Sequence, residues 1–454
     1  MKYSVLKIKV IFSLLLVFSS IDSLYSQVNQ VNQVKLEKTK KGIILKVDST
    51  QFVINGMNWD MVPIGKNVID SNFWGKTDSL IKIGLDREMS LLKEMNVNVI
   101  RHYIDIPPKW IQYIYENYGI FTLLNHSFGR YGLTVDGVWI AKTDYTDPKI
   151  QEALLSEIKQ LTLAYKNTPG LLMYLLGNEN NYGLFWAGSE TEDFPEKEEE
   201  KQLAGEQQGR PMYKLMNTAA KMIHEADVNH PVAICNGDLL FIDIIAQECQ
   251  DVDVFGVNSY RGVSFTDLYK TVREKLDKPV LMTEFGADAF NAINHAEDQK
   301  SQAYYLLGNW KEIYENLAGF GKNENSIGGM TFQFSDGWWK YDFDNRKNTK
   351  IHDKISTWTN GGYSIDLVSG KHNMNEEWFG ICAKGPTDDN GLYELYPRAA
   401  YYVLKEIHQL NPTQQKVTGK FLTNFFNNIN LQEAVSKGKF NEDVLRRINH
   451  NKND

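Results

Sequence analysis

Short apolar runs alternate with amphipathic stretches along most of the chain. Strands are predicted at 52–59, 97–103, 119–125, 171–178, 232–236, 252–258, 280–285 and 328–334. Apolar residues at spacings of three and four, which are typical of helices, occur at 85–95, 150–164, 213–226, 265–276, 298–316 and 398–409. Eight strands with interleaved helices predict an α/β protein built as a single (β/α)8 TIM barrel rather than an open sheet.

Two of these predicted strands end in a glutamate. The run that begins at Leu171 passes into Gly177-Asn178-Glu179, and Glu284 stands where the strand at 280–285 emerges. The carboxyl ends of barrel strands meet at one face, where such folds carry their sites. Two facing carboxylates suit cleavage of a glycosidic bond, because one protonates the leaving oxygen and the other attacks the sugar or activates water. For either glutamate alone, the alternative is a strand cap or a partner for a lysine.

The two ends of the chain lie outside the predicted barrel. Lysines before an apolar run at 10–18, followed by small and polar residues, have the layout of a secretory signal peptide over residues 1–26. We therefore expect export to the periplasm or the exterior and no stable membrane insertion; an N-terminal anchor is the alternative. Residues 27–40 are interpreted as a polar spacer and 41–410 as the barrel. We expect the tail at 411–454 to be partly helical around 421–435 and disordered over about its last ten residues.

Two loops are long for a barrel, and both leave from the predicted catalytic end. The loop after the fourth strand holds Trp186 and an acidic run at 190–200, which we interpret as a solvated segment. The loop after the eighth strand extends from 336 to 396 and is rich in aromatic residues, including Trp338, Trp339, Trp378 and Phe379. Long loops in this position are usually functional, so the rings predict sugar-stacking platforms. The alternative is that they hold the loop on the barrel.

Composition removes several classes of function. A net charge of -8 disfavours a nucleic-acid partner, and an aromatic content of 12% suits a protein that stacks on sugar rings. Cys235, Cys249 and Cys382 form no Cys-x-x-Cys pair, which argues against a zinc site, and a Cys235–Cys249 bridge stays open. The segment 342–345 lacks the glycine and the final acid of a calcium loop. The chain contains no dinucleotide-binding fingerprint, and we expect no metal or cofactor. It also lacks the nucleophile elbow of serine hydrolases, which argues against a serine esterase.

The strand-end motifs resemble a known family. Gly177-Asn178-Glu179, Asn258-Ser-Tyr260, Thr283-Glu284-Phe-Gly286 and the strand 97–101 look like the catalytic barrel of glycoside hydrolase family 2. They also resemble the wider clan of retaining β-glycosidases that contains this family. The segment 397–406 is similar to the last barrel helix of these enzymes, so the resemblance covers roughly residues 45 to 410.

The resemblance implies a role for each matching residue. Glu179 matches the acid/base, and Glu284 matches the nucleophile. Asn178 would hydrogen-bond the sugar 2-hydroxyl, an interaction that strengthens in the transition state. Tyr260 matches the residue that hydrogen-bonds the nucleophile, and Arg101 matches the arginine that keeps the nucleophile ionised.

Further contacts to the sugar are expected near other strand ends. Trp338 stands where the clan often has a stacking tryptophan, and Trp339 is an equal candidate. His126 and His102 follow strand ends and are expected either to contact sugar hydroxyls or to serve the structure.

The resemblance also bears on the substrate. Family 2 enzymes usually carry a β-sandwich and an immunoglobulin-like domain ahead of the barrel, and only about two dozen residues separate the expected cleavage site from the first predicted barrel strand. We therefore expect an open groove and a β-linked poly- or oligosaccharide, with β-glucan favoured. The alternatives are a β-glucan transglycosylase, an exo-acting β-galactosidase, β-mannosidase or β-glucuronidase, and a carbohydrate-binding barrel without activity. The sugar, the linkage and the oligomeric state stay open.

Overall fold

The computed structural model describes residues 31–103, 106–185, 195, 197–291, 294–340, 349–352, 354, 374–412 and 417–451. The predicted signal peptide, Trp186, most of the acidic run at 190–200 and the segment 342–345 lie outside these residues.

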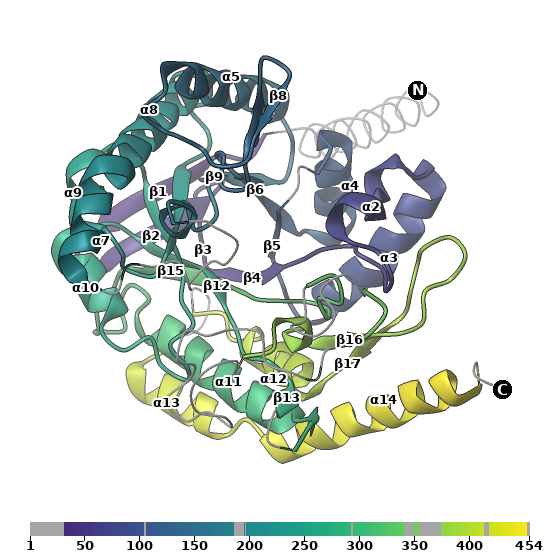
Figure 1. Ribbon diagram of the computed structural model, residues 1–454. Coiled ribbons are helices and arrows are strands. Elements are labelled where there is room, and N and C mark those ends of the chain that lie inside the picture. Colours follow the sequence, from purple (N-terminus) through teal and green to yellow (C-terminus); the bar gives the residue numbers. More distant parts are fainter. Residues whose placement is uncertain are drawn as a thin grey trace, which may run out of the picture.

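The chain folds into a closed barrel of parallel strands, which Figure 1 views along the barrel axis. Its strands are β4 (Ile54–Asn58), β5 (Val99–His102), β6 (Phe121–His126), β9 (Leu171–Leu176), β10 (Val232–Gly237), β11 (Val254–Asn258), β12 (Val280–Phe285) and β15 (Ser326–Thr331). Each strand pairs with the next one in chain order, and β15 pairs with β4 to close the ring. The predicted (β/α)8 barrel is thereby confirmed.

Amphipathic helices surround the barrel (Figure 1). They are α3 (Asp78–Glu94), α4 (Pro108–Tyr118), α5 (Pro148–Tyr165), α8 (Arg210–Ala226), α9 (Ile242–Glu248), α10 (Leu268–Lys275), α11 (Gln299–Glu315) and α12 (Ala399–Ile407). The start of α5 shows why a helix begins there, since the Asp147 carboxylate accepts a hydrogen bond from Lys149 N at 2.8 Å and Pro148 occupies the first turn. Helix α8 buries Met212, Met216 and Ile223, and each such side chain contributes about 1.5–3 kcal/mol.

A small antiparallel sheet lies at the amino-terminal end of the barrel. Its strands are β1 (Val34–Thr39), β2 (Gly42–Val47) and β3 (Thr50–Phe52). Val34 and Leu45 pack in one cluster with Ile54 and Val99, the first residues of β4 and β5. The prediction of a polar spacer up to residue 40 is therefore wrong for 34–39. The charged residues Lys35, Glu37 and Lys38 hid a strand whose backbone pairs with β2 and whose Val34 faces the core.

Shorter elements lie in the loops at and around the barrel. They are α2 (Val68–Ser71), the hairpin β7 (Leu133–Val135) and β8 (Val138–Ile140), α6 (Asn180–Gly183), α7 (Glu198–Ala204), β13 (Phe290–Asn291), β14 (Ala296–Glu297), β16 (Cys382–Lys384) and β17 (Leu395–Pro397). The long loops after β9 and β15 occur where they were predicted. Cys235, Cys249 and Cys382 are buried free thiols, so the Cys235–Cys249 bridge is absent.

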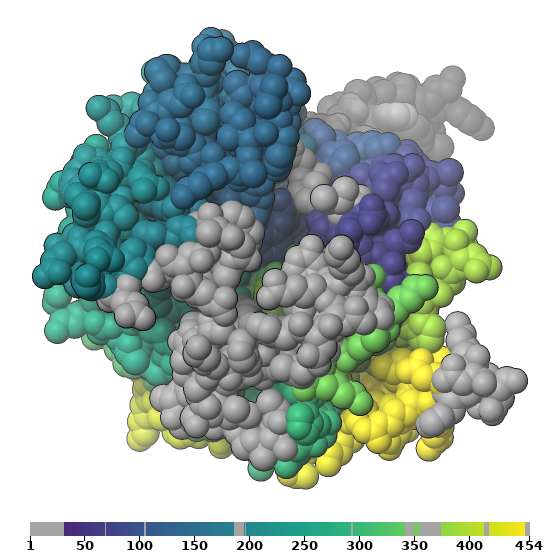
Figure 2. All heavy atoms as spheres, viewed as in Figure 1, coloured from purple at the N-terminus to yellow at the C-terminus, as the bar shows by residue number. Residues whose placement is uncertain are grey.

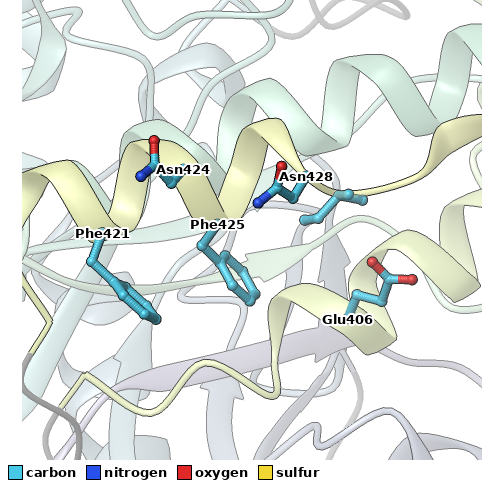
Figure 3. Close-up of a pocket in the computed structure, with 6 residues that line it drawn as sticks. Glu406, Phe421, Asn424, Phe425 and Asn428 are labelled. Atoms are coloured by element: carbon cyan, nitrogen blue, oxygen red, sulfur yellow. The ribbon is translucent and has the colours of Figure 1, made fainter.

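The C-terminal tail packs on the outside of the barrel as α13 (Gly419–Asn427) and α14 (Leu431–Asn451), beside α11 and α12. The predicted helix around 421–435 is confirmed, but the expected disorder of the last ten residues is wrong up to Asn451. Asn441 Nδ2 holds α14 in place by donating to Pro397 O at 2.8 Å. Phe421 and Phe425 project from α13 on one side of a shallow cavity of about 280 Å³, and Glu406 of α12 lies on the other (Figure 3).

None of the helices in the described ranges is both long and apolar enough to cross a membrane.

Candidate active site

Glu179 sits in a sharp turn at the end of β9. Gly177 has a φ of 85°, and a Cβ there would come 2.4 Å from Asn180 Oδ1, so only glycine fits. Asn180 Oδ1 accepts a hydrogen bond from Asn178 N at 2.8 Å. Glu179 itself adopts left-handed backbone angles (φ 54°, ψ 39°), which non-glycine residues seldom adopt outside functional turns. Its N–H donates to Cys235 O of β10 at 3.0 Å, which ties the turn to the next strand.

Glu284 lies at the end of β12 among three hydrogen-bond donors. The pairing of β12 with β15 shifts register between Met282 and Phe285, next to this residue. Glu284 Oε1 accepts from Arg101 Nη1 at 2.9 Å and from Tyr103 Oη at 2.6 Å. Its Oε2 accepts from Tyr260 Oη at 2.9 Å. The donors come from the ends of β5 and β11, so two separate parts of the barrel rim converge on one carboxylate of β12.

The donors around Glu284 are one cation and two neutral phenols. Arg101 is completely buried, and although burial alone lowers its pKa, nearby groups including Tyr103 and Glu284 raise that pKa above its usual value. Burial is also the main cause that raises the pKa of Tyr103 and of Tyr260 well above the ordinary value, and the Glu284 charge adds to it. Both phenols therefore keep their protons and act as donors to the carboxylate.

A hydrogen-bonded chain joins Glu284 to Glu179. From the Arg101 side, Nη2 donates to Asn178 Oδ1 at 2.8 Å. Asn258 Nδ2 donates both to Asn178 Oδ1 and to Glu179 Oε1, each at 3.1 Å. The two glutamates consequently belong to one cluster at the carboxyl end of the barrel, as their positions in the sequence predicted.

The amide of Asn178 is held in one orientation by its partners. Its oxygen accepts from Arg101 and Asn258, whereas its Nδ2 donates to Tyr131 Oη at 2.8 Å. An amide nitrogen carries two hydrogens, so a second donor remains for a ligand at the barrel mouth.

Below the cluster, the Cys235 Sγ donates to Asn258 Oδ1 at 3.2 Å. Burial raises the pKa of this thiol to about 11, which keeps the thiol neutral.

His126 does not join this cluster. Its Nε2 lies 3.4 Å from Glu157 Oε2 of α5. The preceding residue of β6, Asn125, faces the barrel interior instead, where its Oδ1 accepts a hydrogen bond from Arg101 Nε at 2.9 Å. This placement favours the structural role for His126, because the two-residue alternation of β6 turns its ring toward the helices. His102 is turned outward in the same way and packs against Trp59, with ring centroids 5.2 Å apart.

In the described parts of the strand-eight loop, Trp338, Trp378 and Phe379 contact other rings. Trp338 stacks on His352 at 4.4 Å, and His352 stacks on Trp378 at 3.7 Å. Burial lowers the pKa of His352 to about 3, so a neutral imidazole separates the two indoles. Phe379 is completely buried against Tyr260. These contacts favour the alternative interpretation, in which most of these rings hold the loop on the barrel.

Trp339 has different partners from these stacked rings. Its Nε1 donates to Asp60 Oδ2 at 3.0 Å, and Lys340 Nζ lies 4.5 Å from its ring centroid. Lys340 also reaches the ring of Phe332, at 5.6 Å, and Phe332 packs against Tyr260. Trp339 is thus connected through Lys340 and Phe332 to the wall that holds Glu284.

Sequence reasoning missed three residues of the cluster. Tyr103 lies two positions after Arg101, so the strand period could have placed both side chains on the same side. Asn258 lies two positions before Tyr260 in the same motif, but the resemblance to the family implied a role for Tyr260 alone. Tyr131 gave no signal, since it lies in a loop whose course depends on tertiary contacts. Among the described residues, no group of three or more His, Cys, Asp and Glu side chains could hold a metal ion.

Comparison with known proteins gives the following relatives by structure. A family 2 β-galacturonidase from Eisenbergiella tayi, bound to galacturonate, is 17% identical with a TM-score of 0.50, over 84% of this chain and 54% of that one. A β-D-glucuronidase from Dictyoglomus thermophilum is 16% identical (TM-score 0.49; 84% and 54% covered). A β-glucuronidase from Parabacteroides merdae is also 16% identical (TM-score 0.48; 83% and 39% covered). At this identity the first of these shows a shared fold alone, and the chain spans about half of its length.

Comparison by sequence identifies the family. No curated protein matches the chain. The family model described as "Glycosyl hydrolases family 2, TIM barrel domain" matches residues 45–349, which is well over half of the chain. The matched region contains both glutamates and the strands that carry them. The chain therefore belongs to glycosyl hydrolase family 2, through its TIM barrel domain.

Proposed function

We propose that the chain is a retaining β-glycosidase that works by double displacement, with Glu284 as nucleophile and Glu179 as acid/base. The observation that carries this proposal is the cluster itself. Arg101, Tyr103 and Tyr260 all donate to Glu284, while Asn258 links Glu179 to the same network. A carboxylate with three donors is stabilised as an anion, which is the state a nucleophile needs.

In the first step, Glu284 attacks the anomeric carbon and the bond to the leaving oxygen breaks. Glu179 transfers its proton to that oxygen, so the leaving group departs as an alcohol and the sugar is esterified to Glu284. The Glu284 charge favours the protonated form of Glu179 before this step. Asn178 directs its free Nδ2 hydrogen to the sugar 2-hydroxyl, where a hydrogen bond strengthens as charge develops on the ring.

In the second step, water replaces the leaving group. Esterification removes the negative charge of Glu284, so Glu179 is now favoured as a carboxylate and takes a proton from the attacking water. The ester bond breaks, Glu284 is released as a carboxylate, and the sugar leaves with its original anomeric configuration. If a sugar hydroxyl takes the place of water, the same site performs transglycosylation.

The proposed substrate is a β-linked poly- or oligosaccharide, with β-glucan favoured. Support comes from the family and from the aromatic side chains near the glutamates. The N-terminal pattern supports the further proposal that the protein is exported, which N-terminal sequencing of the protein recovered outside the cytoplasm would test by showing whether it begins at Gln27.

The stereochemical course of hydrolysis tests the mechanism. Aryl β-glycosides of glucose, galactose, mannose, glucuronic acid and galacturonic acid should first identify the accepted sugar. Proton NMR during hydrolysis of that substrate should then show the β-anomer of the free sugar first, followed by slow mutarotation. Initial formation of the α-anomer would establish inversion and contradict the proposed mechanism.

A further inference from the structure

Two aromatic side chains are exposed on the loop and hairpin that follow β6. Tyr131 is 48% exposed, and Trp139, on β8, is 61% exposed. The hairpin turns tightly at Asp136 and Gly137, whose φ angles of 51° and 78° fit a two-residue turn. In Figure 1 the hairpin stands at the rim of the barrel, beside β6 and α5. In Figure 2 the blue segment that includes it forms one side of a hollow in this face.

Tyr131 connects this rim directly to the candidate active site. Its hydroxyl accepts the hydrogen bond from Asn178 Nδ2, at 2.8 Å. Asn178 in turn contacts Arg101, which holds Glu284. The phenol of Tyr131 therefore lies at the boundary between the glutamate cluster and the outer rim.

Trp139 continues the rim outward from Tyr131. Its indole lies against Gly132, where an added Cβ would come 2.6 Å from Trp139 Cζ2. Gly132 has a φ of 95°, so both its missing side chain and its backbone conformation allow the indole to lie against this residue, which follows Tyr131 in the chain. The chain thus places one exposed ring after the other, leading away from Asn178.

The exposed indole of Trp139 differs from the other aromatic residues described near the barrel mouth. Trp338 and Trp378 enclose His352, and Phe379 is buried, so those side chains already have aromatic partners. An indole that is mostly exposed beside a carbohydrate site can instead cover the apolar C–H face of a sugar ring.

We propose that Tyr131 and Trp139 form a sugar-stacking subsite for units of the glycan beyond the one held at Glu284. The inference rests on the proposed function and extends it, because it assigns the substrate as a chain of several β-linked sugars. A single sugar at the glutamates would not reach Trp139, whereas the following units of an oligosaccharide would lie across Tyr131 and then across the indole.

The dependence of kcat/KM on chain length tests this subsite. The substrates are the nitrophenyl β-glycoside that the enzyme accepts and β-linked oligosaccharides of the same sugar with two to six units. The ratio of kcat/KM for the hexasaccharide to that for the nitrophenyl glycoside should fall about fivefold in Trp139→Ala, as expected for a loss of about 1 kcal/mol. Trp139→Phe, which keeps a ring, should restore most of the ratio.

Phe440→Ala serves as the matched control, since this equally exposed ring (69%) lies on α14, outside the barrel. It should leave both the activity and the ratio unchanged. An equal loss in Trp139→Ala on every substrate would show a structural role, and an unchanged ratio would show that no sugar stacks there. Either result overturns the subsite.

Binding measurements separate this inference from the proposed function. Calorimetry of Glu284→Gln with hexasaccharides of β-linked glucose, mannose and galactose needs no turnover. Adding Trp139→Ala should raise the Kd of the bound hexasaccharide about fivefold. If the wild-type enzyme cleaves no β-glycoside, the proposed function fails, but this loss of affinity would still support the subsite. An unchanged Kd, or no binding of any hexasaccharide, would overturn it.

Discussion

Glu284 and Glu179 carry the same chemical group at the ends of two barrel strands, yet their surroundings differ. Glu284 accepts hydrogen bonds from the Arg101 guanidinium and from the hydroxyls of Tyr103 and Tyr260. Glu179 accepts a hydrogen bond from the neutral amide of Asn258, and its backbone is held in a left-handed turn. These contacts differ in the charge of the donor, whereas burial is similar, because Glu284 and Glu179 are only 6% and 9% exposed.

We propose that this difference separates the two roles. A buried cation and two phenols that retain their protons surround Glu284, which suits the proposed nucleophile. An amide N–H, in contrast, can donate to a carboxylate or to the carbonyl oxygen of a carboxylic acid. The hydrogen bond from Asn258 is therefore compatible with both protonation states of Glu179, as its proposed role as acid/base requires.

Removal of the nucleophile should have the largest effect. In Glu284→Gln the reacting oxygen is replaced by an amide, so kcat should fall at least about 10⁴-fold, including on substrates with good leaving groups. The measurement is steady-state hydrolysis of an aryl glycoside, with the melting temperature recorded to show that the variant folds. Glu394→Gln, at an exposed glutamate paired with Arg87, is the control and should retain full activity. Activity above a tenth of wild type in Glu284→Gln would contradict the assignment.

Replacement of the acid/base should depend on the leaving group. Glu179→Ala should lower kcat/KM about 10³-fold on a natural glycan but far less on a dinitrophenyl glycoside, whose departure needs no proton. Azide should restore turnover and yield a β-glycosyl azide, because the small anion enters the vacated space and needs no general base. Equal losses on both substrates, with no rescue by azide, would show that Glu179 has another role.

Removal of either hydroxyl beside Glu284 should have an intermediate effect on kcat. Tyr260→Phe and Tyr103→Phe each remove one donor to the nucleophile, so each should lower kcat about 10- to 100-fold while leaving the fold intact. Tyr118→Phe is a matched control, because its hydroxyl donates to Asp86 in the helical layer at 2.5 Å. Tyr118→Phe should leave kcat unchanged. A tyrosine variant with wild-type kcat would show that its hydrogen bond does not support the nucleophile.

Replacement of Asn258, the amide beside Glu179, should cause the smallest loss of kcat/KM. One of its variants should also shift the pH dependence of kcat/KM. Asn258→Asp places a negative charge next to Glu179, which favours the protonated acid, so the basic limb of the pH profile of kcat/KM should move upward by about one unit. Asn258→Ala should lower kcat/KM without that upward shift. If the basic limb stays in place in Asn258→Asp, Glu179 is not the group whose deprotonation sets that limb.

The barrel and the core of the site could be predicted from the sequence because both depend on short-range patterns. Apolar runs marked the strands, and residues at the carboxyl ends of parallel strands must meet at one face. That reasoning brought Glu179, Glu284, Arg101, Asn178 and Tyr260 to the same end of the barrel, where the structure joins them by hydrogen bonds.

The remaining features depend on side-chain direction and on distant contacts. The role of His126 stayed open in the sequence, and the strand alternation turns it toward Glu157, one position out of phase with Asn125. Strand β1 was missed because its charged positions mask the pairing with β2. The aromatic loop was expected to offer stacking platforms, but Trp338 and Trp378 enclose His352, a contact between residues far apart in sequence.

The site of covalent attachment tests the central assignment most directly. A 2-deoxy-2-fluoro β-glycoside of the accepted sugar, with a dinitrophenyl leaving group, slows the second step and lets the glycosyl-enzyme accumulate. Mass spectrometry of the digested enzyme should find one sugar attached to the peptide that contains Glu284, and Glu284→Gln should remain unlabelled. Attachment of the sugar at Glu179 would contradict the assignment of the two glutamates.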